Sequence, residues 1–228
     1  MAKMLVVTSY VQNFHNYRDG VIDEVHAIFG GLYDTIDETE DFRDLTYEKL
    51  AEYATVFIYS PQTWGESSDS PFLVALTKYM ILGGTVLHCH IACFASSREG
   101  KQLLNGGFRM HPPYQAYTFV PTEKGKAFLD GGGEYTHDDE AHLLYSERFL
   151  SREVLLSARL QDHRTYDPGV NAHQDIYAQS SGLLVPLAWK YTYGSGKMFY
   201  CCPGHSVVSF LDPNLRRFLA NGAKWLLG

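Results

Sequence analysis

The chain has 228 residues, of which 45% are hydrophobic and 20% charged, and its 19 Lys and Arg against 26 Asp and Glu leave a formal net charge of −7. This ordinary globular composition excludes disordered, collagen-like and coiled-coil proteins. The acidic balance argues against a nucleic-acid partner and against an anionic membrane surface, both of which select basic patches. At about 150 residues per domain, we expect a single domain over residues 1–228.

No apolar run approaches the roughly 18 residues of a membrane-spanning helix. The hydrophobic start, residues 1–8, is too short for a signal peptide, so we expect a cytoplasmic protein. The four cysteines, Cys89, Cys93, Cys201 and Cys202, lie in apolar stretches without a Cys-x-x-Cys pair. We expect buried, reduced thiols here and neither a disulfide framework nor a zinc knuckle.

The first 90 residues alternate strand and helix patterns. The predicted segments are, in chain order, strand 4–9, helix 16–29, strand 34–39, helix 46–53, strand 54–60, helix 69–82 and strand 85–90. Ser70 is a plausible N-cap of the third helix, and Pro71 suits its first turn. Such alternation with short loops predicts βαβ units and a mostly parallel sheet covered by helices.

The second half is less regular. Residues 107–182 show short strand-like fragments and turns, and they predict an embellishment of the sheet. Regular patterns return at 183–191 and 197–202, which predict a hairpin around the turn at 193–196. A last amphipathic helix is predicted over residues 213–227, opened by an Asp-Pro pair.

Histidines follow several of the predicted strands. In an open parallel sheet, ligands bind beyond the carboxyl ends of the strands. His15, His90 and His205 lie in such positions, and His111 lies in the segment 107–113. This placement predicts that the four imidazoles share one pocket.

His88 and His90 are two residues apart on a predicted strand, so both side chains point to one face. Two imidazoles on one face are a possible start of a zinc site, because neutral imidazole is a common ligand for this metal. The alternative is a pair of buried histidines that are hydrogen-bonded to backbone carbonyls. A catalytic zinc ion normally takes three protein ligands, so the pair alone does not decide the question.

Cys89 stands near a strand-to-helix elbow, the place of the nucleophile in several α/β enzymes. The tip of the turn falls on His90, however, which puts Cys89 one step back on the opposite face. A Cys-dependent amidase that uses Cys89 or Cys93 is therefore an alternative that requires a setting which stabilises the thiolate.

The densest polar cluster spans residues 137–142. It is either a solvated loop or a place where one carboxylate turns inward as a general base or metal ligand. Near another strand end, Trp64 offers an aromatic face for stacking on a sugar, with core packing as the alternative. The glycines form neither a Gly-x-Gly-x-x-Gly motif after a strand nor a Walker loop, so no nucleotide cofactor is expected.

Several motifs together resemble the ThuA-like (trehalose utilisation) family. They are Asn13-Phe14-His15, GGTVLHCHIA at 83–92, LNGGFRMHP at 104–112, Asp139-Glu140, PLAW at 186–189, YGSGKMFY at 193–200, Gly204-His205 and Asp212-Pro213. The order and spacing of these motifs extend the resemblance over nearly the whole chain, as a single ThuA-like domain.

The resemblance implies a class I glutamine amidotransferase-like fold, a flavodoxin-like, doubly wound sheet flanked by helices. It implies that His90 replaces the elbow cysteine of the amidotransferases, so that hydrolysis of glutamine through a thiolate is lost. It also implies carbohydrate use, in particular of disaccharides and their 3-keto derivatives, and in some members a metal ion. The pocket residues carried over by position are His15, His90, His111, Glu140 and His205.

The resulting hypothesis is a carbohydrate-metabolism enzyme acting on a disaccharide or keto-sugar derivative through a His-rich pocket that holds zinc or another divalent metal. The predicted catalytic residues are His90, Glu140 and His205; the metal ligands His90, His111 and His205; and the substrate-binding residues Asn13, His15 and Trp64. The partner is then a small carbohydrate, and the sequence is compatible with a homo-oligomer. The alternative from another class is a non-catalytic sugar-binding or regulatory module on the same scaffold.

Overall fold

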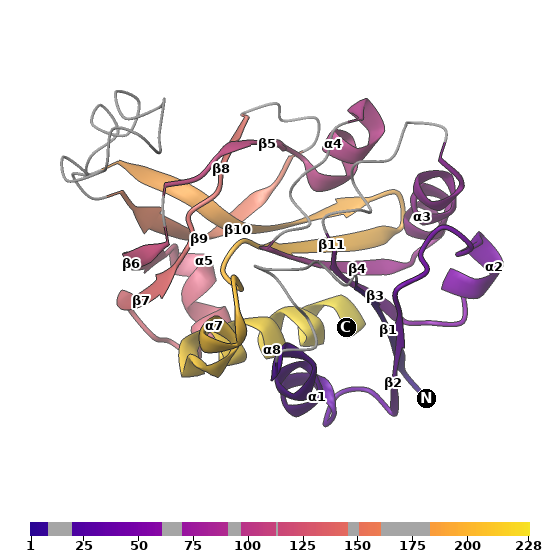
Figure 1. Cartoon of the computed structure of the whole chain (residues 1–228), viewed down its shortest axis with the longest axis horizontal. Helices are drawn as coiled ribbons and strands as arrows, with labels where there is room; N and C mark the ends of the chain where they lie inside the picture. Colours follow the sequence, from indigo (N-terminus) through magenta and orange to yellow (C-terminus); the bar gives the residue numbers. More distant parts are fainter. Residues whose placement is uncertain (9–19, 61–69, 91–96, 113, 146–150, 161–182) are drawn as a thin grey trace.

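The structure is a computed structural model that describes residues 1–8, 20–60, 70–90, 97–112, 114–145, 151–160 and 183–228. A nine-stranded mixed sheet, in the order β2-β1-β3-β4-β11-β10-β9-β6-β7, forms its centre (Figure 1). The strands of this sheet are β1 (Lys3–Thr8), β2 (Thr35–Thr39), β3 (Thr55–Tyr59), β4 (Thr85–Cys89), β6 (Gln115–Pro121), β7 (Tyr135–Asp139), β9 (Glu153–Arg159), β10 (Leu184–Tyr193) and β11 (Gly196–Cys201). A separate two-stranded sheet pairs β5 (Gly107–Met110) with β8 (Leu143–Tyr145).

Helices cover both faces of the sheet. They are α1 (Ile22–Phe29), α2 (Tyr47–Leu50), α3 (Pro71–Ile81), α4 (Arg98–Leu104), α5 (Glu123–Lys126), the 3₁₀ helix η4 (Ala127–Leu129), α7 (Val207–Leu211) and α8 (Pro213–Leu227). In Figure 1, α1, α5, α7 and α8 lie on one side of the sheet, whereas α2, α3 and α4 lie on the other. Within the described residues, every helix is too short or too polar to span a lipid bilayer.

The first half of the sheet, β2-β1-β3-β4-β11, is parallel throughout. All five residues of β3 and of β4 are buried, as expected for strands that are covered by helices on both faces. The predicted strands and helices of residues 20–90 are confirmed where they fall on described residues. Ser70 caps α3 by accepting a hydrogen bond from the Leu73 N–H at 3.2 Å, and Pro71 opens the helix.

The second half, β10-β9-β6-β7, is antiparallel throughout and is joined to the first half by the antiparallel β10–β11 hairpin. The prediction of a mostly parallel sheet is therefore right for one half only. In β6 the alternate residues Tyr117 and Phe119 are buried, a one-faced pattern that antiparallel strands tolerate. Only Gly194 and Ser195 connect β10 to β11, too few residues for the crossover that parallel pairing needs.

The α/β class and the helix-covered sheet are thus as predicted, and the doubly wound, flavodoxin-like arrangement stays a prediction. The predicted hairpin at 183–202 and the last helix are both confirmed, the latter over the predicted residues 213–227. Asp212 caps α8 by accepting hydrogen bonds from two backbone N–H groups, both at 2.9 Å. The inner face of α8 buries Leu215, Phe218 and Leu219 as expected, while Trp225 is half-buried.

Candidate functional site

His90 lies at the elbow that follows β4. Its φ angle of 46° is in the left-handed region, which a residue with a Cβ rarely adopts and which often marks functional turns. His90 and the preceding residue, Cys89, are both completely buried. The His90 Nδ1 atom is 2.7 Å from the carbonyl oxygen of Cys202. With the Nδ1 proton donated to that oxygen, the Nε2 atom carries the imidazole lone pair.

The turn after β11 brings His205 to His90. Gly204 has a φ angle of +142°, and a Cβ on this residue would lie 2.8 Å from the Sγ of Cys89, so the turn requires glycine. The Tyr59 hydroxyl donates a hydrogen bond to the Gly204 carbonyl at 2.8 Å. The ring centroids of His205 and His90 are consequently 5.4 Å apart, with the rings edge to face.

Glu140, directly after β7, lies between the imidazoles and is 7% exposed. The distances from its Oε2 are 3.5 Å to His90 Nε2, 3.3 Å to His142 Nε2 and 3.3 Å to His205 Nδ1. Its Oε1 is 3.6 Å from Nδ1 of His111, whose side chain is 36% exposed. Four imidazoles from four different segments therefore surround one carboxyl group.

The electrostatics of this cluster favour a charged Glu140 carboxylate beside a neutral His90. Burial raises the pKa of the Glu140 carboxyl, but hydrogen bonds with His142, His205 and His90 together outweigh burial and hold the pKa well below its usual range. Burial lowers the pKa of His90, and the neighbouring His142 lowers it further. Neutral imidazole and ionised carboxylate are the forms in which these side chains bind metal ions.

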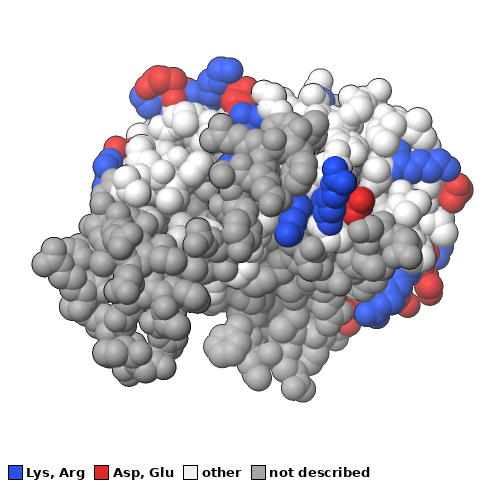
Figure 2. All heavy atoms as spheres, turned by 90° about the horizontal axis from the view of Figure 1, so that it is seen from above, with Lys and Arg blue, Asp and Glu red and all other residues white. Residues whose placement is uncertain are grey.

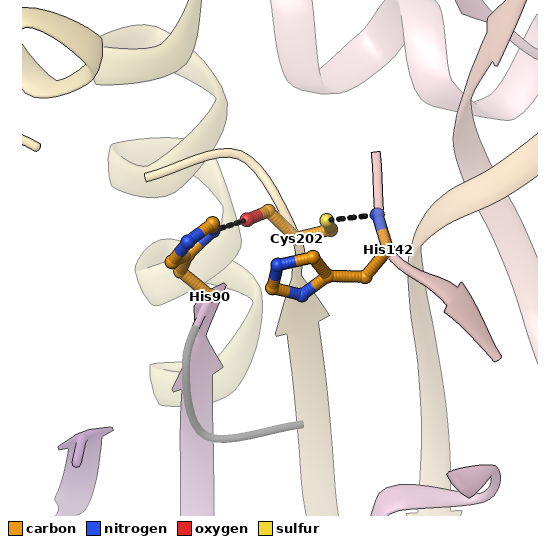
Figure 3. A group of neighbouring side chains, drawn as sticks. All are labelled: His90, His142 and Cys202. Atoms are coloured by element: carbon orange, nitrogen blue, oxygen red, sulfur yellow. Dashed lines mark hydrogen bonds between the residues drawn. The ribbon is translucent and has the colours of Figure 1, made fainter. Parts of the chain in front are cut away.

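Two sets of side chains in the described residues have donor atoms within 4.8 Å of one another: His90, Glu140 and His205; and His90, His142 and Cys202. Figure 3 shows the second set, in which the Cys202 Sγ accepts the backbone N–H of His142 at 3.3 Å. Burial raises the pKa of the Cys202 thiol well above its usual value, and the thiol donates to the Glu140 carbonyl at 3.5 Å. The Cys202 sulfur is already engaged with two backbone groups, whereas Oε2 of Glu140 lies within 3.5 Å of imidazole nitrogens of His90 and His205, so the first set is the better candidate.

The first set also fits a metal by distance. Ligand atoms roughly 2.0–2.1 Å from a tetrahedral zinc ion stand about 3.4 Å apart. The Oε2 of Glu140 is 3.5 Å from one histidine nitrogen, on His90, and 3.3 Å from the other, on His205. The carbonyl that accepts the Nδ1 proton of His90 is the kind of outer partner that orients a metal-binding histidine. The residues present therefore fit a zinc ion or a similar divalent cation.

The structure brings together the predicted residues His90, His111, Glu140 and His205, which come from four segments of the chain. His15, Asn13, Trp64 and Cys93 lie outside the described residues. Of the two alternatives for His88 and His90, a metal site shared by both finds no support in the described residues, since only His90 belongs to a donor set, and His90 contacts a backbone carbonyl as the other alternative expects. His88 is completely buried beside Tyr200, with ring centroids 5.8 Å apart, and it belongs to neither donor set.

The sequence analysis includes Asp139 and His142 in the polar cluster at 137–142 but assigns neither of them a role, and it does not place Cys202 in the site. An inward carboxylate is one of its two alternatives for the cluster, and the structure buries both Asp139 and Glu140. The spacing of two between Glu140 and His142 was the available signal, since residues two apart share a face in extended chain. His137 faces elsewhere, and its Nδ1 is 3.6 Å from a carboxylate oxygen of Asp212.

The thiol of Cys89 does not have the setting of a nucleophile. It is completely buried, and it donates a hydrogen bond to the Pro203 carbonyl at 3.5 Å. Burial raises its pKa well above the usual value for a thiol. Nucleophilic cysteines have lowered pKa values and solvent access, so this alternative loses its support at Cys89.

Fold and site together define an α/β protein with a cluster of imidazoles around a carboxylate at the ends of its strands. The family model described as ThuA, trehalose utilisation, matches residues 3–226, so the chain belongs to the ThuA family. Membership of this family implies a role related to trehalose utilisation.

Solved structures with low sequence identity share the fold. A ThuA-like protein from Bacteroides uniformis is 19% identical with a TM-score of 0.73, over 99% of this chain and 91% of that chain. A ThuA-like protein from Parabacteroides merdae is 18% identical with a TM-score of 0.74, over 99% and 90%. The cytoplasmic protein STM1381 from Salmonella typhimurium is 14% identical with a TM-score of 0.64, over 98% and 99%. No curated protein sequence matches the chain.

Proposed function

We propose that this protein is an enzyme of carbohydrate metabolism whose pocket of His90, Glu140 and His205 binds zinc or another divalent cation. The observation that carries the proposal is the placement of two imidazole nitrogens around one buried carboxylate oxygen, at 3.5 and 3.3 Å. The proposed substrate is a disaccharide or a keto-sugar derivative, in keeping with the trehalose-utilisation family.

A divalent cation in this pocket would polarise a carbonyl or hydroxyl oxygen of the sugar as a Lewis acid. Glu140 supplies the negative charge of the pocket, because its low pKa keeps it ionised. A carboxylate with so low a pKa is a weak base, and an imidazole is better matched to proton transfer near pH 7. His111, whose side chain is 36% exposed and whose Nδ1 is 3.6 Å from Glu140, is the most exposed imidazole around this carboxylate.

Apolar and aromatic side chains line the same region and suit the face of a sugar ring. Tyr114 is 39% exposed, and its ring centroid is 4.9 Å from that of His205. Phe108 is partly buried, with its ring centroid 5.4 Å from that of His142. These rings add to the proposal a stacking surface next to the imidazoles, whereas Asn13, His15 and Trp64 remain predicted substrate-binding residues.

The proposal includes a cytoplasmic location, a flavodoxin-like scaffold and no nucleic-acid partner. One structural neighbour is titled a cytoplasmic protein. The order β2-β1-β3-β4-β11 of the parallel strands supports the scaffold. On the coloured part of the face in Figure 2, Lys and Arg are interspersed with Asp and Glu, and such a mixture favours a polyanion less than a uniformly basic patch does.

The first experiment is a zinc titration of metal-depleted protein, followed by an assay of disaccharides and their 3-keto derivatives with and without the metal. We expect one zinc ion per chain and sugar turnover that depends on it. His205→Ala should lose both, while the control His26→Ala should lose neither, because His26 is an exposed residue of α1 that contacts Glu38.

Other outcomes separate the alternatives. Stoichiometric zinc in His205→Ala would remove this metal site. Saturable sugar binding without turnover would identify a sugar-binding module instead of an enzyme. Rapid alkylation of Cys93 by iodoacetamide near pH 7, with loss of activity, would favour the Cys-dependent amidase.

A further inference from the structure

Asp139 is a completely buried residue that the proposed mechanism does not use. Its Oδ2 accepts a hydrogen bond from the backbone N–H of Gly204 at 2.9 Å, and its Oδ1 accepts one from the N–H of Glu140 at 2.7 Å. The Oδ1 atom also lies 4.0 Å from Nδ1 of His90. The Asp139 carboxyl group is thus close to all three segments that carry the proposed metal ligands: it contacts Glu140 itself, the residue before His205, and the ring of His90.

The sheet itself does not set the distance between two of these ligands. Glu140 follows β7, the last strand of the sheet, and His205 follows β11, near its middle. Three strands, β10, β9 and β6, separate β11 from β7, so no backbone ladder joins the two strand ends. Direct contacts between the loops must therefore hold the ligands at their spacing.

Asp139 makes the strongest of these direct contacts. Among the described residues, other backbone contacts between these segments run through the Cys202 thiol, which donates to the Glu140 carbonyl and accepts from the His142 N–H. Sulfur is a weak donor and a weak acceptor, whereas a carboxylate that accepts backbone N–H groups makes strong hydrogen bonds. The Gly204 peptide is held on both sides, since Tyr59 binds its carbonyl oxygen.

We propose that Asp139 is a positioning residue that fixes His205 and Glu140 at metal-binding distance by bridging the end of β7 to the turn after β11. This inference rests on the proposed function, because it concerns the same metal pocket. Asp139 itself contributes no ligand atom to the candidate donor sets. Its role is the one that outer partners play in metal sites, where their loss weakens metal binding about 10- to 100-fold.

The substitution Asp139→Asn tests this role with little change in size. The asparagine side chain has one acceptor oxygen, so it keeps one of the two backbone hydrogen bonds and turns an amide N–H₂ toward the other donor. We expect zinc affinity at least about tenfold weaker and a changed visible absorption spectrum of the cobalt(II) form. The matched control is Asp138→Asn, since Asp138 is the exposed neighbour on the same strand.

The comparison with the wild-type protein separates the possible failures. If wild-type protein binds zinc and Asp139→Asn binds it with equal affinity and an identical cobalt spectrum, the positioning role is wrong and the proposed metal pocket stands. If wild-type protein binds no zinc, the proposed pocket itself fails. A purely structural role would lower the melting temperature of the metal-free variant without changing the affinity of its folded fraction.

A second variant covers the case in which Asp139→Asn does not fold. Tyr59→Phe removes the hydrogen bond on the other side of the Gly204 peptide and leaves Asp139 in place. We expect zinc affinity to fall by a smaller factor than in Asp139→Asn, because Tyr59→Phe removes a contact of the turn after β11 but keeps the contact between Asp139 and Glu140. Wild-type zinc affinity in Tyr59→Phe would overturn the claim that anchoring of this turn positions His205.

Discussion

The two halves of the sheet contribute different things to the molecule. The parallel half supplies a core in which Val6, Phe57 and Leu87 are completely buried, and it supplies His90 and His205 at the ends of β4 and β11. In the antiparallel half, the outer strands β6 and β7 are buried on alternate residues, and β7 leads into the buried Glu140. The comparison teaches that stability and ligand binding are divided between the halves, so substitutions should affect them separately.

The largest effect on stability is expected in the parallel half. Phe29 at the end of α1 is completely buried, and its ring centroid is 5.7 Å from that of Phe57. Phe29→Ala should cost about 3–5 kcal/mol of unfolding free energy, measured by urea denaturation, because it leaves a cavity. Zinc affinity of the folded protein should be unchanged. The exposed control Val74→Ala should cost no more than about 0.5 kcal/mol.

In the antiparallel half, we expect a substitution to reduce zinc affinity more than stability. Glu140→Gln removes the charged oxygen shared by the imidazoles, so zinc affinity should fall at least about 100-fold, measured by titration of metal-depleted protein. The unfolding free energy of the metal-free protein should also fall at neutral pH, but by less than in Phe29→Ala, because the hydrogen bonds that lower the pKa of Glu140 stabilise the folded state. Glu134→Gln, at an exposed position just before β7, should bind zinc normally. Zinc binding by both variants would show that the ligands lie elsewhere.

The smallest expected effect is a difference in unfolding free energy between two helix-cap substitutions, one in each half. Ser70→Ala should cost about 1 kcal/mol, because Ser70 accepts a single hydrogen bond at the start of α3. Thr122→Ala should cost about 2 kcal/mol, because Thr122 caps α5 through Gly125 and also donates to the Val154 carbonyl of β9. Thermal or urea unfolding measures both. Equal costs would mean that the link from α5 to β9 adds no stability.

Much of the parallel half was predictable. Continuous apolar runs identify strands that are buried on both faces, and cap residues such as Ser70 and Asp212 locate helix starts. Those signals are local and lie within a few residues of each element. The antiparallel strands were less predictable, because strands covered on one face have weak patterns and pair with partners far away in the sequence.

The site was predictable in part. His90, His111, Glu140 and His205 were identified by their positions after strands and by the family motifs. Glu140 was assigned to the site by the family resemblance, because the residue pattern alone does not tell which carboxylate of a polar cluster turns inward. The role proposed for Asp139 was not predictable for the same reason, because it depends on a hydrogen bond with Gly204, 65 residues away in the chain.

The sequence by itself determined the alternation of strands and helices, the α/β class and the family, because short-range periodicity and motif order encode them. Only the tertiary structure decided which side chains meet. The ends of β7 and β11 come together although three strands separate them in the sheet. Such contacts depend on sheet twist and loop packing across long sequence separations, and no local pattern specifies them.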